Sequence, residues 1–176
     1  MIRYLLPVLL ALCTTQCTRS PNWQVFESKE GGFKIEFPGN PTPSKTYNAA
    51  MTEVQVFKLE RGAAGIMQIV YFDVPGEHPP ETVETLLKID CLHPFSGDSK
   101  FTPQDPQKIS LGQVPGISVI GTAPKSDSLP QGGWEEDRCY LSGTRFYHLI
   151  AIGPNTQATQ ETAKHFFDSF NLLPKE

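Results

Sequence analysis

Residues 134–152 read WEEDRCYLSGTRFYHLIAI, and this stretch decides the fold because two β-rich runs flank a Ser142-Gly143 pair. That pair suits the positive φ angles of a tight turn, so the stretch predicts a β-hairpin. Side chains alternate between the faces of a strand, and a two-residue loop at 142/143 or at 143/144 keeps the same faces together. One face is expected to hold Asp137, Cys139, Leu141, Phe146, His148, Ile150 and Ile152. The other is expected to hold Arg138, Tyr140, Arg145, Tyr147, Leu149 and Ala151.

The first of these faces is the more apolar and carries a cysteine, so an element with a partner cysteine is expected to pack on it. The double proline at 79–80 favours the start of a helix. At helical spacing, one side of this helix holds Val83, Leu86, Leu87 and Cys91. Asp90 interrupts that side, and the helix is therefore expected to fray or end near Ile89. Its cysteine is the expected partner of Cys139.

The rest of the chain reads as further strands and a second helix. Thr156 is the expected cap of that helix, and Phe166 and Phe167 fall on its apolar side. Residues 66–74 are apolar on both faces, as in a strand at the centre of a sheet. Other strands are expected within residues 23–26, 33–37, 45–60, 108–111 and 117–122. These elements predict an α+β fold, an antiparallel sheet of about six or seven strands with helices packed on its faces.

The first 17 residues have the features of an export signal. Arg3 precedes an apolar run at residues 5–12, which is too short to cross a bilayer as a helix, since a crossing takes about 20 residues. The cysteines that follow resemble the cleavage site of bacterial lipoproteins, in which the cysteine after the cut carries the lipid. Cys17 is the expected attachment site because cleavage there leaves an even pair of cysteines, and Cys13 is the alternative. Simple secretion with cleavage in the same region also stays open.

The mature chain reads as one globular domain at residues 23–174, joined to the signal by a tether at residues 18–22. A length of 176 residues suits a single domain with its own core. The net charge is −4, the acidic and basic residues are interspersed, and the chain has no run of lysine and arginine. Nucleic-acid binding is therefore not expected. The expected location is the bacterial cell envelope.

Export makes a disulfide between Cys91 and Cys139 the expected pairing, because oxidising compartments preserve such bonds. The alternative is a zinc site formed by Cys91, His93, Cys139 and His148, since two cysteines and two histidines can hold zinc tetrahedrally. Cys-x-His is not a common spacing in structural zinc sites, and a disulfide would exclude the metal. The chain has no Cys-x-x-Cys motif, so a redox-active pair is not expected either. We therefore expect no metal and no cofactor.

The sequence carries no catalytic motif. Glu135 and Asp137 share a strand face, as paired carboxylates in a glycosidase do, but adjacent acids on a strand are usually solvated. The serines lack the nucleophile-elbow pattern, and the glycines do not form a phosphate-binding loop. An enzyme is therefore not the expected class.

Three short stretches recur in one known superfamily: GGFKIEFPGNP at residues 31–41, LGQVPG at 111–116 and FFDSFNLL at 166–173. In these stretches the chain resembles the PsbP-like proteins, which include the photosystem II extrinsic protein, a Ran-binding nuclear import factor and many bacterial envelope lipoproteins. The resemblance is to the lipoprotein branch, and it implies an α/β/α sandwich. It carries over no functional residue, because members of the superfamily share no common site.

These observations favour an envelope-anchored or exported lipoprotein that acts as a binding or scaffolding module. Its expected partners are the membrane, through the lipid, and a protein of the envelope. Provided that no helix covers it, the expected contact surface is the hairpin face with Arg138, Tyr140, Arg145 and Tyr147. The alternative is a small-molecule-binding protein or hydrolase that uses a cleft near Asp137 and His148. A chaperone-like assembly factor is a third hypothesis, which the residues do not separate from the first.

Overall fold

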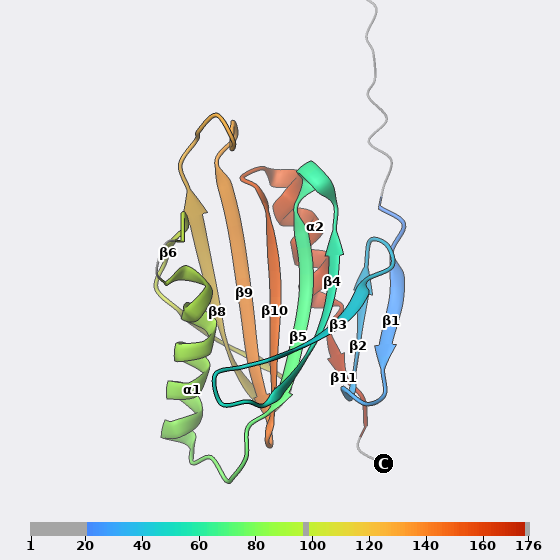
Figure 1. Cartoon of the computed structure of the whole chain (residues 1–176), viewed down its shortest axis with the longest axis vertical. Coiled ribbons are helices and arrows are strands. Elements are labelled where there is room, and N and C mark those ends of the chain that lie inside the picture. The colour runs from blue at the N-terminus through green and yellow to red at the C-terminus, as the bar shows by residue number, and fades with distance from the viewer. Residues whose placement is uncertain (1–20, 97–98, 175–176) are drawn as a thin grey trace, which may run out of the picture.

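A computed structural model describes residues 21–96 and 99–174. Within these residues lie an eight-stranded and a three-stranded antiparallel sheet and two α-helices (Figure 1). The helices are α1 (Pro80–Leu92) and α2 (Gln157–Asp168), and two short 3-10 helices span Gly62–Ala64 and His93–Phe95. The strands are β1 (Gln24–Ser28), β2 (Phe33–Phe37), β3 (Thr42–Tyr47), β4 (Glu53–Glu60), β5 (Ile66–Asp73), β6 (Thr102–Pro103), β7 (Gln107–Leu111), β8 (Val114–Ala123), β9 (Gly133–Ser142), β10 (Arg145–Pro154) and β11 (Asn171–Leu172).

The predicted hairpin forms the middle of the large sheet. Gly143 and Thr144 join β9 to β10, Arg145 pairs with Ser142, and Gly143 has the positive φ, 63°, that such a turn requires. The strand order across the sheet is β3-β4-β5-β10-β9-β8-β6, with β7 also paired to β8. β10 therefore lies between β9 and β5, and the side chains of the hairpin divide between two faces as their alternation predicts.

One face of the large sheet, which we call the α1 face, packs against α1 over β8 and β9. Leu87 and Cys91 of α1 share a buried cluster with Ile117 of β8 and with Cys139 and Leu141 of β9. The apolar side of the helix and the first face of the hairpin thus meet in one layer, because burying both removes their apolar surface from water.

The helix α1 is longer than its sequence predicts. It runs through Asp90 to Leu92 instead of ending near Ile89. Asp90 is half-buried beside the apolar side of the helix, so the backbone continues past it, and Pro94 follows in a short 3-10 helix. Between α1 and β7 the chain also forms the two-residue strand β6.

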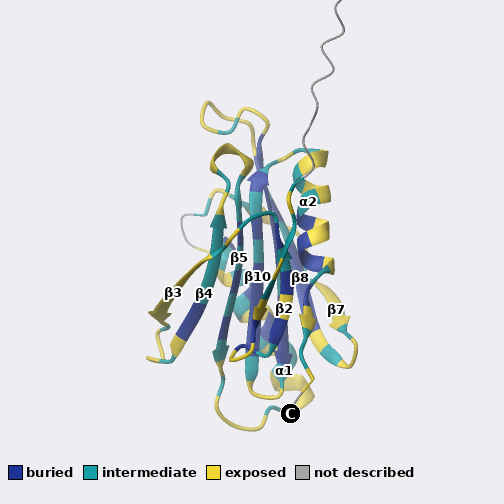
Figure 2. Cartoon of the chain, turned by 90° about the vertical axis from the view of Figure 1, so that its right-hand side faces the viewer, coloured by how far each residue is buried: buried dark blue, intermediate teal, exposed yellow. Residues whose placement is uncertain are grey.

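The opposite face, which we call the α2 face, packs against α2 and the small sheet β1-β2-β11 (Figure 1). Residues on the inner side of α2 are buried and those on its outer side are exposed (Figure 2). This core is rich in aromatic rings. Its phenylalanines and tyrosines below 5% exposure are Phe33, Phe37, Tyr71, Tyr140, Tyr147, Phe166, Phe167 and Phe170.

The expected single sheet of six or seven strands is wrong in number and arrangement, although the mixed α and β composition and the antiparallel pairing are as expected. The first two strands, β1 and β2, do not join the large sheet but pair with each other and with β11. The apolar side chains of β2, Phe33, Ile35 and Phe37, are 0–1% exposed because they pack against the large sheet from one side. Among the described residues, neither helix is long and apolar enough to span a membrane.

Candidate functional site

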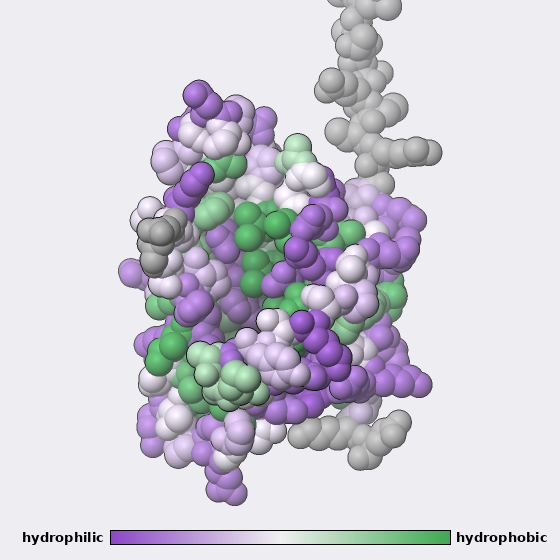
Figure 3. Space-filling view, in the orientation of Figure 1, coloured by the Kyte–Doolittle hydropathy of each residue, from purple (hydrophilic) through white to green (hydrophobic). Residues whose placement is uncertain are grey.

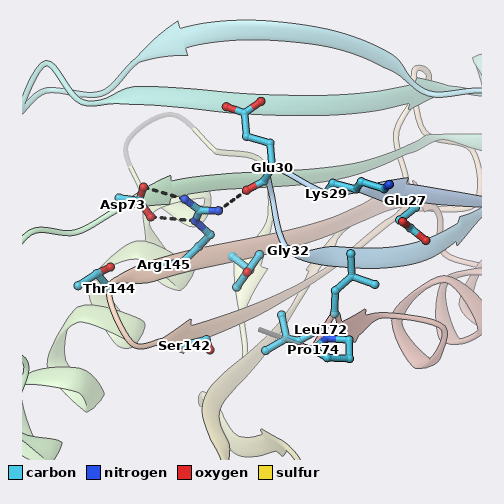
Figure 4. Close-up of a pocket in the computed structure, with 12 residues that line it drawn as sticks. Glu27, Lys29, Glu30, Gly32, Asp73, Ser142, Thr144, Arg145, Leu172 and Pro174 are labelled. Carbon is cyan, nitrogen blue, oxygen red and sulfur yellow. Dashed lines mark hydrogen bonds and ion pairs between the residues drawn. The ribbon is translucent and has the colours of Figure 1, made fainter. Parts of the chain in front are cut away.

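The turn of the central hairpin lies beside a cavity of about 800 Å³, whose lining is about half polar and half apolar. Four parts of the chain that are distant in sequence form its walls: the β1–β2 turn, the end of β5, the β9–β10 turn and the residues around β11 (Figure 4). The lining residues are Glu27, Lys29, Glu30, Gly32, Asp73, Ser142, Thr144, Arg145, Tyr147, Leu172, Leu173 and Pro174. We call this the turn cavity.

Arg145 is fixed in the wall of the turn cavity rather than free to bind a ligand. Its Nε and Nη2 donate to the two carboxylate oxygens of Asp73, both at 2.8 Å, and its Nη1 donates to the carbonyl of Glu30 (Figure 4). Its guanidinium also lies 5.2 Å from the ring centre of Tyr71. The hydrogen bonds from Arg145 hold the pKa of Asp73 below its usual value, so the pair stays charged at neutral pH. Arg145 therefore ties the β1–β2 turn to the large sheet.

Two further hydrogen bonds hold the same turn. The hydroxyl of Tyr147 donates to the carbonyl of Gly31 at 2.8 Å, and the backbone N–H of Leu173 donates to the carbonyl of Gly32 at 2.8 Å. Burial raises the pKa of Tyr147 to about 12, so its hydroxyl remains a donor at physiological pH. Three consecutive carbonyls, from Glu30 to Gly32, are thus bonded to the rest of the molecule, which makes the cavity wall a fixed surface.

The charged side chains at the rim of the turn cavity are available for binding. Glu27, Lys29 and Glu30 are exposed, and within residues 21–96 and 99–174 none of the three forms a salt bridge. The cavity consequently offers both signs of charge on a fixed frame. Such a surface can hold a polar, extended ligand that carries both signs of charge.

The structure separates the four residues of the expected contact surface. Arg145 and Tyr147 line the turn cavity. Arg138 instead packs against Phe167 of α2, and Tyr140 packs against Phe170, just after α2. Arg138 donates from Nε to Glu136 at 2.7 Å and lies 4.5 Å from the ring centre of Phe167. Tyr140 is 4% exposed. The condition that no helix covers this face is therefore not met, because Phe167 of α2 packs on Arg138, and Phe170 just after the helix stacks on Tyr140.

On the α1 face, Cys91 and Cys139 lie at disulfide distance. Both residues are fully buried and their Cα atoms are 5.8 Å apart, within the range that a disulfide spans. His148 pairs with Cys139 across the hairpin, and its ligand nitrogen lies within 4.8 Å of both sulfurs. His93, the fourth residue of the zinc alternative, is exposed and lies outside this group.

A row of buried carboxyl groups continues along β9 from Cys139. Asp137 is 0% exposed and accepts a 2.7 Å hydrogen bond from Nε2 of His148, while its other oxygen has no partner within the described residues. Glu135 is 3% exposed. Burial raises the pKa of Asp137, against the opposing effect of His148. Burial, and then the charge of Asp137, raise the pKa of Glu135 to about 7.

The α1 face is only partly covered. α1 lies over β8 and β9, and beside it Figure 3 shows apolar side chains gathered in a hollow over β5 and β10. The half-exposed apolar residues of these two strands on this face are Ile66, Val70, Phe72, Ile150 and Ile152. His148 lies at the border between the covered and the open part of the face, since it is the β10 neighbour of Cys139.

The α1 face holds one hydrogen-bonded pair of a carboxylate and a histidine, Asp137 and His148. Asp137 and His148 have the geometry of an acid that orients a base. Within the described residues, however, no serine or threonine hydroxyl is hydrogen-bonded to His148, and Ser118 bonds to Glu136 on the other face. The sulfurs of Cys91 and Cys139 lie near His148 but are buried. Among the described residues, His148 is thus oriented by a carboxylate and has no hydroxyl hydrogen-bonded to it.

Besides the residues of these two faces, the chain has an expected lipid-attachment site and a histidine on α2. Cys13 and Cys17, and with them the lipid attachment, lie outside the described residues. His165 stacks on Trp23 with ring centres 3.9 Å apart and bonds to Glu36 at 2.6 Å, so it joins α2 to the small sheet. Sequence reasoning did not identify Lys29 or Asp73 as cavity residues, because no local pattern shows that residues 27–32 fold back onto the hairpin turn.

Comparison with known proteins shows the fold alone. No protein-family model matches the chain, and no curated protein matches it either. The solution structure of cyanobacterial PsbP (CyanoP) from Synechocystis sp. PCC 6803 is similar, with a TM-score of 0.60 over 92% of this chain and 98% of that chain. The sequence identity between the two is 6%. The protein therefore has the PsbP-like fold, and its function has to be argued from its own residues.

Proposed function

We propose that this protein is an exported, lipid-anchored binding module of the bacterial cell envelope, and that the turn cavity holds an extended segment of a partner protein. The observation that carries the proposal is the combination in one place of a fixed frame and free charges. Arg145 and Tyr147 hold the β1–β2 turn in place through hydrogen bonds to its carbonyls. Because the cavity wall is already ordered, binding of a ligand costs less conformational entropy. The exposed charges of Lys29, Glu27 and Glu30 then determine which partner segments bind.

A protein segment suits the turn cavity better than an apolar small molecule does. Small-molecule sites are mostly apolar with a few polar groups. Here polar and apolar surface contribute about equally: five of the twelve lining residues are charged, and Leu172, Leu173 and Pro174 are apolar. An extended chain carries both charges and backbone hydrogen-bonding groups, and it can lie along such a wall.

The export signal supports a tether at the membrane. The apolar run at residues 5–12 and the cysteines after it support cleavage and lipid attachment at Cys17, with Cys13 as the alternative. The buried pair Cys91 and Cys139 supports an oxidising compartment, because two sulfurs at disulfide distance in such a compartment form a bond. One lipid chain gives weak membrane binding, so a partner would strengthen the attachment.

The proposal is tested by photo-cross-linking the full-length chain in bacterial cells. A photoreactive residue at position 29 is expected to cross-link one discrete envelope protein, whose cross-linked peptide mass spectrometry can sequence. The matched control carries the same residue at Asp127, an exposed position in the β8–β9 loop at the opposite end of the molecule (Figure 1). Charge reversal by Glu27→Lys is expected to reduce the cross-link at position 29 severalfold.

Equal cross-linking at both positions, or none at position 29, would show that the turn cavity is not the partner site. In the same cells, Cys17→Ser is expected to move the chain from the membrane fraction to the soluble fraction, while Cys13→Ser leaves it in place. The reverse result would assign the lipid to Cys13. Retention of both variants and of the double variant in the membrane fraction would overturn the lipid anchor.

The alternative function, a small-molecule-binding protein or hydrolase, has one observation in its favour. Asp137 and His148 are hydrogen-bonded at 2.7 Å beside the apolar hollow of the α1 face. A hydrolase of this kind would lose its turnover in His148→Gln and keep it in Lys29→Gln. A partner site in the turn cavity predicts the opposite sensitivity, since position 29 governs binding and position 148 does not.

A further inference from the structure

The three potential metal ligands on the α1 face come from three different elements and meet in one place. Cys91 lies on α1, Cys139 on β9 and His148 on β10. Their ligand atoms all lie within 4.8 Å of one another, and all three residues are buried. A zinc ion binds cysteine sulfur at about 2.3 Å and histidine nitrogen at about 2.0 Å. Ligand atoms at these separations can therefore reach one ion after small side-chain movements.

The surroundings of His148 match those of a metal ligand. Histidines that bind metals almost always give their second ring nitrogen to a carboxylate or carbonyl, which fixes the ring and raises the basicity of the ligand nitrogen. Here Nε2 of His148 is bonded to Asp137 at 2.7 Å, so Nδ1 is the nitrogen left for a metal. A disulfide alone gives no reason for a histidine and an oriented carboxylate beside the sulfurs.

Asp137 adds an independent argument. Its side chain is 0% exposed, and one of its two oxygens has no hydrogen-bond partner within the described residues. A buried carboxylate is costly unless hydrogen bonds compensate it. Two thiolates and a dication cancel in charge, and His148 bound to that dication would become a stronger hydrogen-bond donor to Asp137.

We propose that Cys91, Cys139 and His148 bind one zinc ion when the two cysteines are reduced, with Asp137 orienting His148. The disulfide and the metal site are alternative states of the same pair of sulfurs. Three protein ligands leave a fourth position for water or another ligand, as in zinc sites with two cysteines and one histidine. The inference rests on the α1 face and does not depend on the turn cavity or on the lipid anchor.

Conversion of the disulfide to the zinc-bound form takes a reduction and a metal-binding step. A phosphine reductant gives two electrons to the sulfur–sulfur bond, each sulfur takes a proton from water, and the water oxygen ends on the phosphine oxide. Zinc then replaces the two thiol protons, which are released to solvent. Reoxidation needs an electron acceptor such as a disulfide oxidant, and it expels the ion because the thiolates are consumed.

The experiment is a titration of the full folded domain with Co²⁺, a spectroscopic substitute for Zn²⁺, after reduction with a phosphine. The expected result is one Co²⁺ per chain, with a thiolate-to-cobalt charge-transfer band that Zn²⁺ abolishes. Oxidised protein is expected to bind none. Asp137→Asn is expected to weaken the affinity by about 10- to 100-fold, the usual effect of removing a carboxylate behind a ligating histidine. The matched control, His93→Gln, is expected to bind like the wild type.

Each contrary result has a definite meaning. Reduced, folded protein without the charge-transfer band overturns the site, and so does His148→Gln that binds as tightly as the wild type. If reduction unfolds the chain, Zn²⁺ added to the reduced chain must restore the far-ultraviolet circular dichroism of the oxidised protein. A reduced chain that stays unfolded with Zn²⁺ also overturns the proposal.

Discussion

At the scale of single residues, the β9 strand is unusual because it buries three consecutive acids within a hairpin. Glu136 is bonded to Arg138 on the α2 face. Glu135 and Asp137 lie on the α1 face, where neither has an arginine or lysine partner within the described residues. Gly121, the β8 neighbour of Glu135, leaves room for Phe95, since a Cβ at that glycine would lie 2.3 Å from the ring. Packing of Phe95 on β8 thus contributes to the dry environment of Glu135.

Glu135→Gln is expected to change the pH dependence of stability. The pKa of Glu135 is about 7 in the folded protein and 4.5 ordinarily, so the folded state holds this proton more tightly. The wild type therefore loses stability as pH rises from about 4.5 to about 7, and the amide variant does not. We expect the variant to be more stable at pH 8, by up to about 3 kcal/mol, and equal to the wild type at pH 4. Urea unfolding from pH 4 to pH 8 measures this, with exposed Glu77→Gln as the control. A gain of the same size at both ends of the range would refute the buried-carboxyl explanation.

At the scale of elements, α2 shows how a local signal and tertiary packing cooperate. Thr156 caps the helix, accepting a hydrogen bond from the backbone N–H of Thr159 at 3.2 Å. Phe166 and Phe167 on the same helix are buried in the aromatic core of the α2 face. The cap starts the helix at the register that directs these rings inward.

Thr156→Ala is expected to destabilise the protein by about 1 kcal/mol, because it leaves a helix N–H without its acceptor. Thr156→Ser keeps the accepting oxygen and is the matched control. We expect it to lower the free energy of unfolding by only a few tenths of a kcal/mol. Thermal unfolding followed by circular dichroism measures both. An alanine variant as stable as the serine variant would mean that packing of α2, and not its cap, determines where the helix begins.

At the scale of the whole molecule, two attachments hold separate parts to the large sheet. Arg145 and Tyr147 fasten the small sheet to the hairpin turn, and the sulfurs of Cys91 and Cys139 meet between α1 and β9. The second attachment joins residues 48 positions apart in the chain. A cross-link over a loop of that length restricts the unfolded chain considerably.

The native exported protein is expected to contain the Cys91–Cys139 disulfide. Alkylation of free thiols followed by mass spectrometry should find both cysteines blocked before reduction and labelled after it. Reduction in the presence of a chelator is expected to lower the free energy of unfolding by up to about 4 kcal/mol, the chain-entropy value for such a loop. The double variant Cys91→Ala/Cys139→Ala is the control and should not respond to reductant. Free thiols in the native exported protein would contradict both the bond and the expected compartment.

The amino-acid sequence by itself determined the local features of this protein: the central hairpin with its two faces, the cap and apolar side of α2, the start of α1 and the likeness to the PsbP-like fold. The hairpin and the helix features follow from alternation, helical spacing and turn chemistry, which act over a few residues, whereas the likeness rests on the resemblance of the stretches at residues 31–41, 111–116 and 166–173 to that superfamily. Only the tertiary structure decided that β1 and β2 form a separate sheet, that α2 covers Arg138 and Tyr140, and that residues 27–32 enclose a cavity with Arg145. The reason is physical: which apolar faces cover one another depends on the fit of the whole core, and contacts between distant segments leave no periodic signal in the chain.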